Sequence, residues 1–184
     1  MDLVQKKNDY FDIMTSELGQ IEAITDELLV LARPQKHRFE QNDVVLMLQE
    51  VISMFEPQAA VFNVEMITKF ADLVPFVNCV PNQLKIVFSN IIKNGIEAMP
   101  NGGDLLIKLK VVAEESVIIS FSDNGSGIPE DKLAKLGDTF YTTKQDGIGL
   151  GLMVSYKIIE SHEGTISVTS TWGKGTIVEI ILKK

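Results

Sequence analysis

The sequence predicts an α+β fold in two layers, a mixed sheet with helices on one face, preceded by a long N-terminal helix. Segments with a strand pattern and segments with a helical apolar stripe alternate along residues 43–184, without the regular spacing of β-α-β units. A length of 184 residues fits one domain with a helical appendage. Apolar residues make up 45% of the chain, which is enough for a packed core and too much for a disordered chain.

Residues 1–33 are predicted to form one long helix. From Phe11 onward, apolar or small residues recur at alternating steps of 3 and 4, at Phe11, Met14, Leu18, Ile21, Thr25, Leu28 and Ala32. This spacing is typical of the seam of a helical bundle. Because a one-sided helix cannot bury its seam alone, we interpret it as half of a helical hairpin. Dimerisation or a first half that this chain lacks would complete the hairpin; a helix folded back on its own domain is the alternative.

Pro34 ends that helix, because the residue before a proline avoids helical angles, and residues 34–42 are predicted to be a linker. Asp43 is a candidate helix N-cap, and Pro81 suits the first turn of another helix. Within the domain at 43–184, the predicted helices cover 44–60, 81–99 and 152–161, with a helical turn at 130–136. The predicted strands cover 61–70, 75–80, 104–112, 116–122, 164–170 and 176–182.

Charge and composition exclude several classes of protein. The chain has 25 acidic and 17 basic residues, a formal net charge of −8, which argues against a nucleic-acid binder and against adsorption to anionic lipid. Its longest uninterrupted apolar runs are five residues, whereas a membrane span needs about 20. The single cysteine, Cys79, excludes an internal disulfide and suits a reducing compartment. We therefore expect a cytoplasmic domain, whether or not its parent protein is anchored in a membrane.

Two asparagines lie one helical turn apart on the helix predicted at 81–99. Asn90, Asn94 and Glu97 fall at i, i+4 and i+7, so they share one face. Asparagine is a poor helix former, so two of them in one helix suggest that their amide oxygens have a function. Neutral oxygen ligands suit Mg²⁺, which takes its other ligands from water and phosphates. Taken alone, however, the pair is better explained as a solvated polar stripe.

Three further segments carry polar or glycine-rich sequence. Asp123–Gly127 follows a strand, where a carboxylate can accept from the amine of adenine and glycines let a flat ring approach, although turn chemistry explains it as well. Gly147–Gly151 leads into a helix, whose free N–H groups make an anion site. Between them, Phe140–Lys144 offers two hydroxyls and a lysine that could close over a polyphosphate. Each motif alone is more simply explained as part of the structure. The occurrence of all of them in this order, however, indicates a common function.

In that order the motifs resemble those of the catalytic, ATP-binding domain of sensor histidine kinases. This family shares the Bergerat fold of the GHKL superfamily with type II topoisomerases, a heat-shock chaperone and mismatch-repair ATPases. Asn90–Asn94 resembles the N box, Asp123–Gly127 the G1 box, Phe140–Lys144 the F box, Gly147–Gly151 the G2 box and Gly173–Thr176 the last glycine box. The N-terminal helix resembles the second helix of the dimerisation and phosphotransfer hairpin. Stretches 82–85, 96–100 and 140–144 look most like sporulation-type kinases.

The resemblance implies that ATP and Mg²⁺ bind at these motifs. Asp123 would hold the adenine amino group, with Thr176 nearby through water, and Gly125 and Gly127 would shape the base pocket. Asn94 would ligate Mg²⁺. The expected catalytic residues are Asn90, close to metal and phosphates, and Lys144, which would neutralise charge on the γ-phosphate. Gly147, Gly149, Leu150 and Gly151 would border the triphosphate.

One position separates two reaction classes. The ATP-hydrolysing members of the superfamily carry a glutamate at the first N-box position to activate water, and Asn90 has no basic lone pair for that proton transfer. The domain should hold ATP until a better nucleophile arrives, in this family a histidine on the first hairpin helix. His37 lies in the linker, and His162 is better explained as a residue that gains from the dipole at a helix C-terminus. We therefore expect a fragment without the phosphoacceptor.

Three functions stay open on this basis. The first is the ATP-binding half of a protein-histidine kinase in a two-component system. The second is a regulatory module in which nucleotide only gates the binding of a partner, and the third is a GHKL-type ATPase. The expected partners are a phosphoacceptor-histidine helix of the same family, a response regulator indirectly, a second copy in a homodimer, and a protein inhibitor on the N-terminal helix; nucleic acid is not expected.

Overall fold

The structure is a computed structural model, and it describes residues 14, 38–71, 75–112, 115–133, 136 and 150–184. The chain divides into two units, residues 1–36 and 37–184, and the described residues other than Met14 lie in the second unit. The helix predicted at residues 1–33 therefore lies outside the described residues apart from Met14. Its hairpin interpretation and the domain boundaries expected from the sequence stay predictions.

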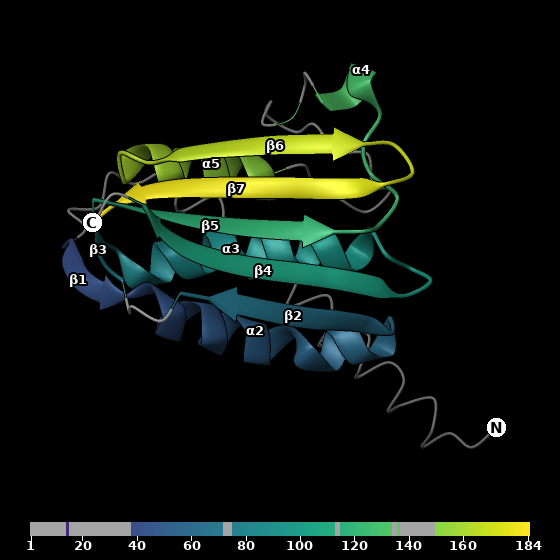
Figure 1. Ribbon diagram of the computed structural model, residues 1–184, viewed down its shortest axis with the longest axis horizontal. Coiled ribbons are helices and arrows are strands. Elements are labelled where there is room, and N and C mark those ends of the chain that lie inside the picture. Colours follow the sequence, from purple (N-terminus) through teal and green to yellow (C-terminus); the bar gives the residue numbers. More distant parts are fainter. Residues whose placement is uncertain (1–13, 15–37, 72–74, 113–114, 134–135, 137–149) are drawn as a thin grey trace. The chain divides into compact units, whose positions relative to one another are not determined.

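A five-stranded mixed sheet forms one layer of the second unit (Figure 1). The strand order is β2-β4-β5-β7-β6, with bounds Val64–Phe70, Gly103–Val112, Ser116–Asp123, Gly175–Lys183 and Thr165–Thr171. Strand β2 pairs with β4 in parallel, and the other neighbours are antiparallel. The sheet is therefore mixed, as the sequence predicts.

Three helices cover one face of this sheet: α2 (Val44–Val61), α3 (Pro81–Glu97) and α5 (Gly151–Ser161) (Figure 1). Helix α3 contacts both of the others, so it is the middle of the helical layer. One further helical turn, α4 (Glu130–Leu133), follows β5. The predicted two-layer α+β fold is confirmed.

The hydrophobic core lies between the sheet and the helical layer. Alternate residues of β4 and β5 are almost fully buried, at Leu105, Ile107, Leu109, Val117, Ile119 and Phe121. Helix α3 contributes Leu84, Val87, Phe88, Ile91 and Ile92. The rings of Phe88 and Phe121 have centroids 6.1 Å apart. Because each such side chain contributes about 1.5–3 kcal/mol on burial, α3 is held firmly on the sheet.

A two-stranded sheet that the sequence analysis missed pairs β1 (Glu40–Asp43) with β3 (Phe76–Cys79). Residues 40–42 belong to the segment that was predicted to be a linker. Their sequence, Glu-Gln-Asn, has little β-propensity, so no local pattern indicates a strand. Antiparallel pairing with β3, in the register that places Glu40 opposite Cys79, imposes the extended conformation.

Most element boundaries agree with the sequence, and one differs. Asp43 is the N-cap of α2, since its Oδ1 accepts from Leu46 N at 3.0 Å, and α3 begins at Pro81. The strand predicted from residue 61 begins only at Val64. Helix α2 continues through Val61 and the chain then reverses at Asn63, which has a φ of 54°. Asparagine tolerates this left-handed conformation better than other residues with a side chain, so the turn falls there.

Helix α2 is the one helix among the described residues whose length and composition would suit a membrane span, although none of its uninterrupted apolar runs exceeds five residues. Its 18 residues are long and apolar enough to cross a membrane by length and composition alone. In this structure its apolar side is buried in the domain core, at Val44, Met47, Leu48, Val51, Ile52 and Ala59. A core helix passes the same test, and here its buried stripe packs on α3 and β2.

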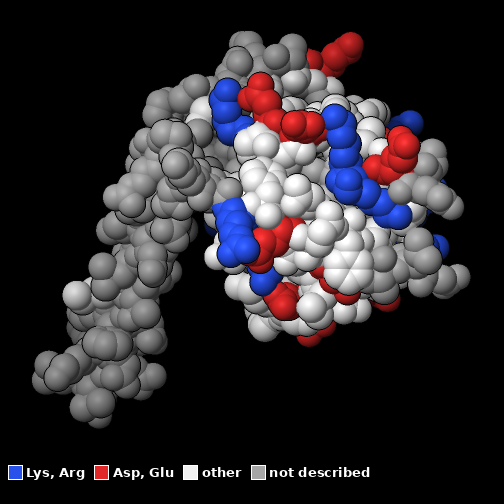
Figure 2. All heavy atoms as spheres, turned by 90° about the vertical axis from the view of Figure 1, so that its left-hand side faces the viewer, with Lys and Arg blue, Asp and Glu red and all other residues white. Residues whose placement is uncertain are grey.

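The end of the unit that carries β1 and β3 is largely uncharged at its centre, with charged side chains around it (Figure 2). Phe76 is 52% exposed, and Phe39 lies just before β1. The ring of Phe39 packs on His162, with centroids 4.9 Å apart. This contact joins the β1–β3 sheet to the C-terminal end of α5.

Candidate functional site

The two predicted asparagines lie on α3, and the first of them contacts the start of α5. Asn90 Nδ2 donates to Gly151 O at 3.0 Å. A Cβ on Gly151 would lie 3.3–3.4 Å from the Asn90 side chain, so a larger residue would press on the amide. Asn90 is half-buried and Asn94, one turn further on, is exposed. The structure thus brings Asn90 and Gly151 together and leaves Asn94 beside them at the surface.

The C-terminal end of α3 contacts the loop after β5. Ser126 N donates to Ala98 O at 3.0 Å, directly after the last residue of α3. A Cβ on Gly125 would lie 2.5 Å from the same carbonyl oxygen, so only glycine allows the loop to come this close. From residue 90 to residue 98, an α-helix rises about 12 Å. Asn90, in the middle of α3, is therefore separated along the helix from the loop at its C-terminal end.

Asp123, the last residue of β5, is held by backbone donors from two segments. Its Oδ1 accepts from Gly125 N at 2.9 Å and from Thr176 N at 3.2 Å. Neither bond uses the second oxygen, Oδ2. Burial raises the pKa of this carboxyl above its ordinary value, and the hydrogen bonds from the backbone act in the opposite direction. The two backbone donors fix the orientation of the carboxylate through Oδ1. Oδ2 therefore points in a defined direction, in which it could accept a hydrogen bond from a ligand.

Glycines allow the strands to cross closely at this carboxylate. Gly127 has a φ of +64°, and a Cβ there would lie 2.1 Å from Thr171 O. Gly175 has a φ of +114°, and a Cβ there would lie 2.0 Å from Asp123 O. Both positions require a left-handed conformation and a close approach of two backbones. Close packing against Thr171 therefore explains why glycine is needed at position 127, and its expected role in a base pocket stays a prediction.

Helix α5 begins at Gly151, with Leu150 at its N-cap. The side chain of Leu150 is buried, so only its backbone could face a ligand. Gly151 O accepts from Ser155 Oγ at 2.8 Å as well as from Asn90. Lys144, Gly147 and Gly149, like the rest of Phe140–Lys144, lie outside the described residues. Their expected roles at the phosphates stay predictions.

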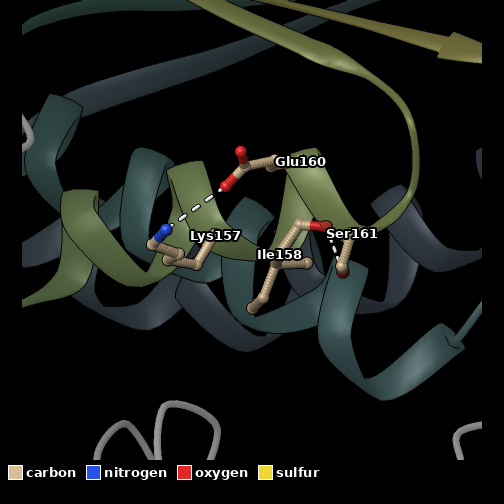
Figure 3. Close-up of polar contacts among 4 residues, drawn as sticks. All are labelled: Lys157, Ile158, Glu160 and Ser161. Atoms are coloured by element: carbon tan, nitrogen blue, oxygen red, sulfur yellow. Dashed lines mark hydrogen bonds and ion pairs between the residues drawn. The ribbon is translucent and has the colours of Figure 1, made fainter. Parts of the chain in front are cut away.

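His162 follows the last residue of α5 and is buried. Val80 N donates to His162 Nε2 at 3.0 Å, so the proton of the neutral ring is on Nδ1, which lies 2.7 Å from Ile158 O. Ser161 Oγ donates to the same carbonyl oxygen at 2.7 Å, while Lys157 and Glu160 form an ion pair one turn away (Figure 3). The predicted position at the end of the helix is correct, and Nδ1 donates there to the carbonyl oxygen of Ile158, in the last turn of α5.

A metal site made of charged ligands is not apparent in the described part of the chain. No group of three or more His, Cys, Asp or Glu side chains there could hold an ion. The amide oxygens of Asn90 and Asn94 are neutral ligands and do not belong to such a group. They fit an ion such as Mg²⁺ that keeps several waters and takes further ligands from phosphates.

Sequence reasoning missed two groups that build the site. One is Ala98, whose carbonyl oxygen receives the loop after β5. The other is Ser170, whose hydroxyl contacts Ile128 N, Gly175 O and Thr176 Oγ1. A backbone carbonyl leaves no signal in the sequence. Ser170 could have been found, since the turn at Gly173–Thr176 places it opposite Thr176 in a hairpin.

Comparison with known proteins identifies the family to which this fold belongs. A family described as histidine kinase-, DNA gyrase B-, and HSP90-like ATPase matches residues 79–184, more than half of the chain. The chain belongs to this family of nucleotide-binding domains. The match includes α3, the loop after β5, α5 and the hairpin of β6 and β7, which are the elements that carry the site.

Within the family the chain is similar to histidine kinases. It is 49% identical over 173 residues to Sporulation kinase E of Bacillus subtilis (strain 168), which covers 94% of this chain and 23% of that protein. It matches the catalytic domain of histidine kinase ThkA with a TM-score of 0.72 and 28% identity, over 79% of this chain and 95% of that one. Histidine kinase ThkA in complex with response regulator protein TrrA matches with a TM-score of 0.79 and 26% identity, over 100% of this chain and 53% of that one. The chain thus spans less than a quarter of the length of Sporulation kinase E.

Proposed function

We propose that this chain binds Mg-ATP along α3 and donates the γ-phosphate to a histidine side chain that it does not itself carry. Membership in a nucleotide-binding family and similarity to histidine kinases support this function. The single observation that carries it is the carboxylate of Asp123, half-buried at one end of α3 and oriented by two backbone donors.

The base binds at Asp123 and the phosphates bind towards Asn90. Oδ2 of Asp123 accepts from the exocyclic amine of adenine, a donor that guanine replaces with an oxygen acceptor at the same ring position. A carboxylate accepts only, so it favours adenine over guanine. The rise of about 12 Å along the helix axis from residue 98 to residue 90 leaves room for the ribose and phosphates between these two positions.

Asn94 ligates the metal, and Asn90 lies beside it with its amide already oriented. The bond from Asn90 Nδ2 to Gly151 O turns Oδ1 of Asn90 away from that carbonyl. When bound, Mg²⁺ neutralises charge on the phosphates. Gly151 lets the start of α5 approach closely, and N–H groups at a helix N-terminus attract anions. Lys144, Gly147 and Gly149 are assigned to the same phosphates on the strength of their sequence motifs.

The reaction is transfer to nitrogen and not to water. Asn90 stands where a general base would be needed for hydrolysis, and an amide is not basic. A ring nitrogen of the incoming imidazole attacks the γ-phosphorus with its own lone pair. A bond forms from that nitrogen to phosphorus, the bond from phosphorus to the β,γ-bridging oxygen breaks, and ADP leaves. The imidazole then loses its remaining ring proton to solvent. His162 is not the acceptor, because its Nε2 is buried and accepts from Val80 N.

The Asp123→Asn variant tests the base site. The amide keeps an oxygen for Gly125 N and Thr176 N but turns an N–H donor toward the adenine amine. A lost hydrogen bond to a charged group is worth about 1.5–3 kcal/mol, so ATP affinity measured by titration calorimetry should fall by roughly tenfold or more. Glu65→Gln on β2, an exposed carboxylate at the edge of the sheet, is the matched control and should bind as the wild type does. Equal affinity of Asp123→Asn and wild type would show that the base binds elsewhere.

Label transfer tests the reaction. A histidine helix from a kinase of the same family, added in trans with γ-labelled ATP, should become labelled. ATP binding without transfer would instead favour a regulatory module, and steady ATP turnover by the chain alone would favour an ATPase. A second copy in a homodimer, a response regulator acting indirectly, and an inhibitor on the N-terminal helix are the partners that the kinase function implies. A cytoplasmic location belongs to the same proposal.

A further inference from the structure

The hydroxyl of Ser170, on β6, has every hydrogen-bonding position occupied. Ile128 N donates to Ser170 Oγ at 2.8 Å, and Ser170 Oγ donates to Gly175 O at 2.9 Å. Thr176 Oγ1 lies 3.0 Å from the same oxygen. A serine hydroxyl has one proton and two lone pairs, which matches these three contacts.

The direction of the bond between the two hydroxyls follows from this count. A carbonyl oxygen can only accept, so the one proton of Ser170 is used on Gly175 O. The hydroxyl of Thr176 must therefore donate to Ser170. Its own proton is then committed, and only lone pairs of Thr176 Oγ1 remain for any other partner.

We infer that Ser170 is a positioning residue that sets the nucleotide specificity of the site through Thr176. Thr176 is joined to Asp123 by the bond from Thr176 N to Asp123 Oδ1 at 3.2 Å. With its proton held by Ser170, the Thr176 hydroxyl is an acceptor, as the Asp123 carboxylate is. Two acceptors side by side favour a ligand edge that donates, such as the amine of adenine, and disfavour an edge that carries an oxygen. The inference rests on the proposed binding of ATP at Asp123.

Inosine triphosphate is the probe that isolates this effect, because it differs from ATP by an oxygen in place of the adenine amine. In Ser170→Ala the Thr176 hydroxyl is free to rotate and donate to that oxygen. The ratio of ATP affinity to inosine triphosphate affinity should fall by about three- to tenfold, the effect of one neutral hydrogen bond. Ser170→Thr retains the hydroxyl and should restore the ratio. Ser167→Ala, an exposed serine on the same strand, should leave it unchanged.

A double-mutant cycle separates positioning from a general loss of structure. Thr176→Val removes the acceptor hydroxyl with little change of shape and should itself lower the ratio. If Ser170 acts through Thr176, then Ser170→Ala has no further effect on the ratio in the Thr176→Val background. The melting temperature, measured alongside, reports the stability lost when Ile128 N and Gly175 O lose a partner, and it should fall for Ser170→Ala in both backgrounds.

The outcomes keep this inference apart from the proposed function. Wild type that binds neither nucleotide would contradict the ATP site itself. Wild type that prefers ATP, with an unchanged preference in Ser170→Ala, would overturn the role of Ser170 and leave the site standing. Additive effects of the two substitutions on the ratio would also overturn it, since Ser170 would then act independently of Thr176.

Discussion

Two regions of the candidate site are built in different ways: the C-terminal end of α3 near Asp123, and the middle of α3 near Asn90. Near Asp123, backbone donors from two segments hold one carboxylate oxygen, and glycines stand where a Cβ would collide with a backbone oxygen. Near Asn90, a side-chain amide donates to the backbone carbonyl of Gly151, and the side chain of Asn94 is exposed. Backbone contacts thus build the first region, whereas side chains of α3 build the second.

This difference separates stability from binding. A change at the Asp123 end should affect unfolding and ligand binding together, because the same contacts serve both. A change near Asn90 should weaken the binding of the phosphates and the metal, with little effect on the free energy of unfolding. Preformed contacts at the Asp123 end also give it a fixed hydrogen-bonding direction, which is what recognition of a base needs.

The largest effect is expected at the crossing of backbones next to Asp123. Gly175→Ala would place a methyl group 2.0 Å from Asp123 O at a φ of +114°. We expect a loss of at least about 2 kcal/mol in the free energy of unfolding, measured by urea titration. Gly173→Ala is the matched control, since Gly173 has a φ of +76° but nothing within 4 Å of its Cβ position. Gly173→Ala should lose only the free energy of placing a side chain in a left-handed conformation, about 1 kcal/mol. Equal losses in the two variants would mean that the backbones at Gly175 and Asp123 can move apart.

The second prediction concerns the charge of Asp123. Burial raises its pKa in the folded chain above the ordinary value of 3.8, so the folded state binds more protons than the unfolded state just above that pH. The contribution of this group to stability is therefore lost as pH rises through that window. Asp123→Asn lacks the charge and should be more stable than wild type near pH 7, with the difference shrinking toward acid pH. Urea unfolding at a series of pH values measures this.

The same variant should lose ATP binding while it gains stability, which would show that the carboxylate is retained for its ligand. If Asp123→Asn were less stable than wild type at neutral pH, the backbone donors would outweigh the effect of burial. The direction of the pKa shift would then be wrong.

On α3, one turn after Asn90, Asn94→Ala should weaken binding without weakening the fold. Asn94 is exposed, so the free energy of unfolding should change by no more than about 0.5 kcal/mol. ATP affinity in the presence of Mg²⁺ should fall by roughly tenfold or more, and affinity in its absence should hardly change. Lys93→Ala, the exposed neighbour on another face of α3, is the control. Equal losses with and without Mg²⁺ would remove Asn94 from the metal site.

The smallest effect is expected at Gly95, in the last turn of α3. Glycine costs a helix about 1 kcal/mol relative to alanine, which alone would make Gly95→Ala stabilising. A Cβ there would lie 2.9 Å from Leu105 Cδ1, the far end of a flexible side chain in β4. The two effects oppose each other, so thermal unfolding should change by less than about 1 kcal/mol. A large destabilisation would show that the contact between α3 and β4 cannot adjust.

Sequence reasoning predicted the elements whose signals are local. Apolar periodicity predicted the helices of the core and the strands of the five-stranded sheet, and Asp43 and Pro81 marked two helix starts. Strand β1 escaped because its polar residues are extended only by pairing with β3, which lies more than 30 residues further along the chain. The start of β2 was misplaced because α2 runs on to Val61 before the turn at Asn63.

The site was predicted residue by residue but not contact by contact. Motif order brought Asp123, Thr176, Asn90 and Asn94 into one hypothesis; the structure joins Asp123 to Thr176 and Asn90 to Gly151, and a shared site stays a prediction. The sequence could not show that Gly125 avoids Ala98 O or that Ser170 orients Thr176, because these depend on backbone groups from distant segments. The hydrogen bond from Val80 N to His162 Nε2 could not be predicted either, since the donor is a backbone group 82 residues away in the sequence.

Hydrogen exchange with and without Mg-ATP tests the central claim most directly. A nucleotide bound along α3 should slow exchange of backbone amides in two regions at once, in the loop 124–128 with the turn at 173–176 and in the first turn of α5 after Gly151. Exchange in β2, at the far edge of the sheet, should stay the same. Protection of only one of these two regions, or of neither, would contradict a single site that spans them.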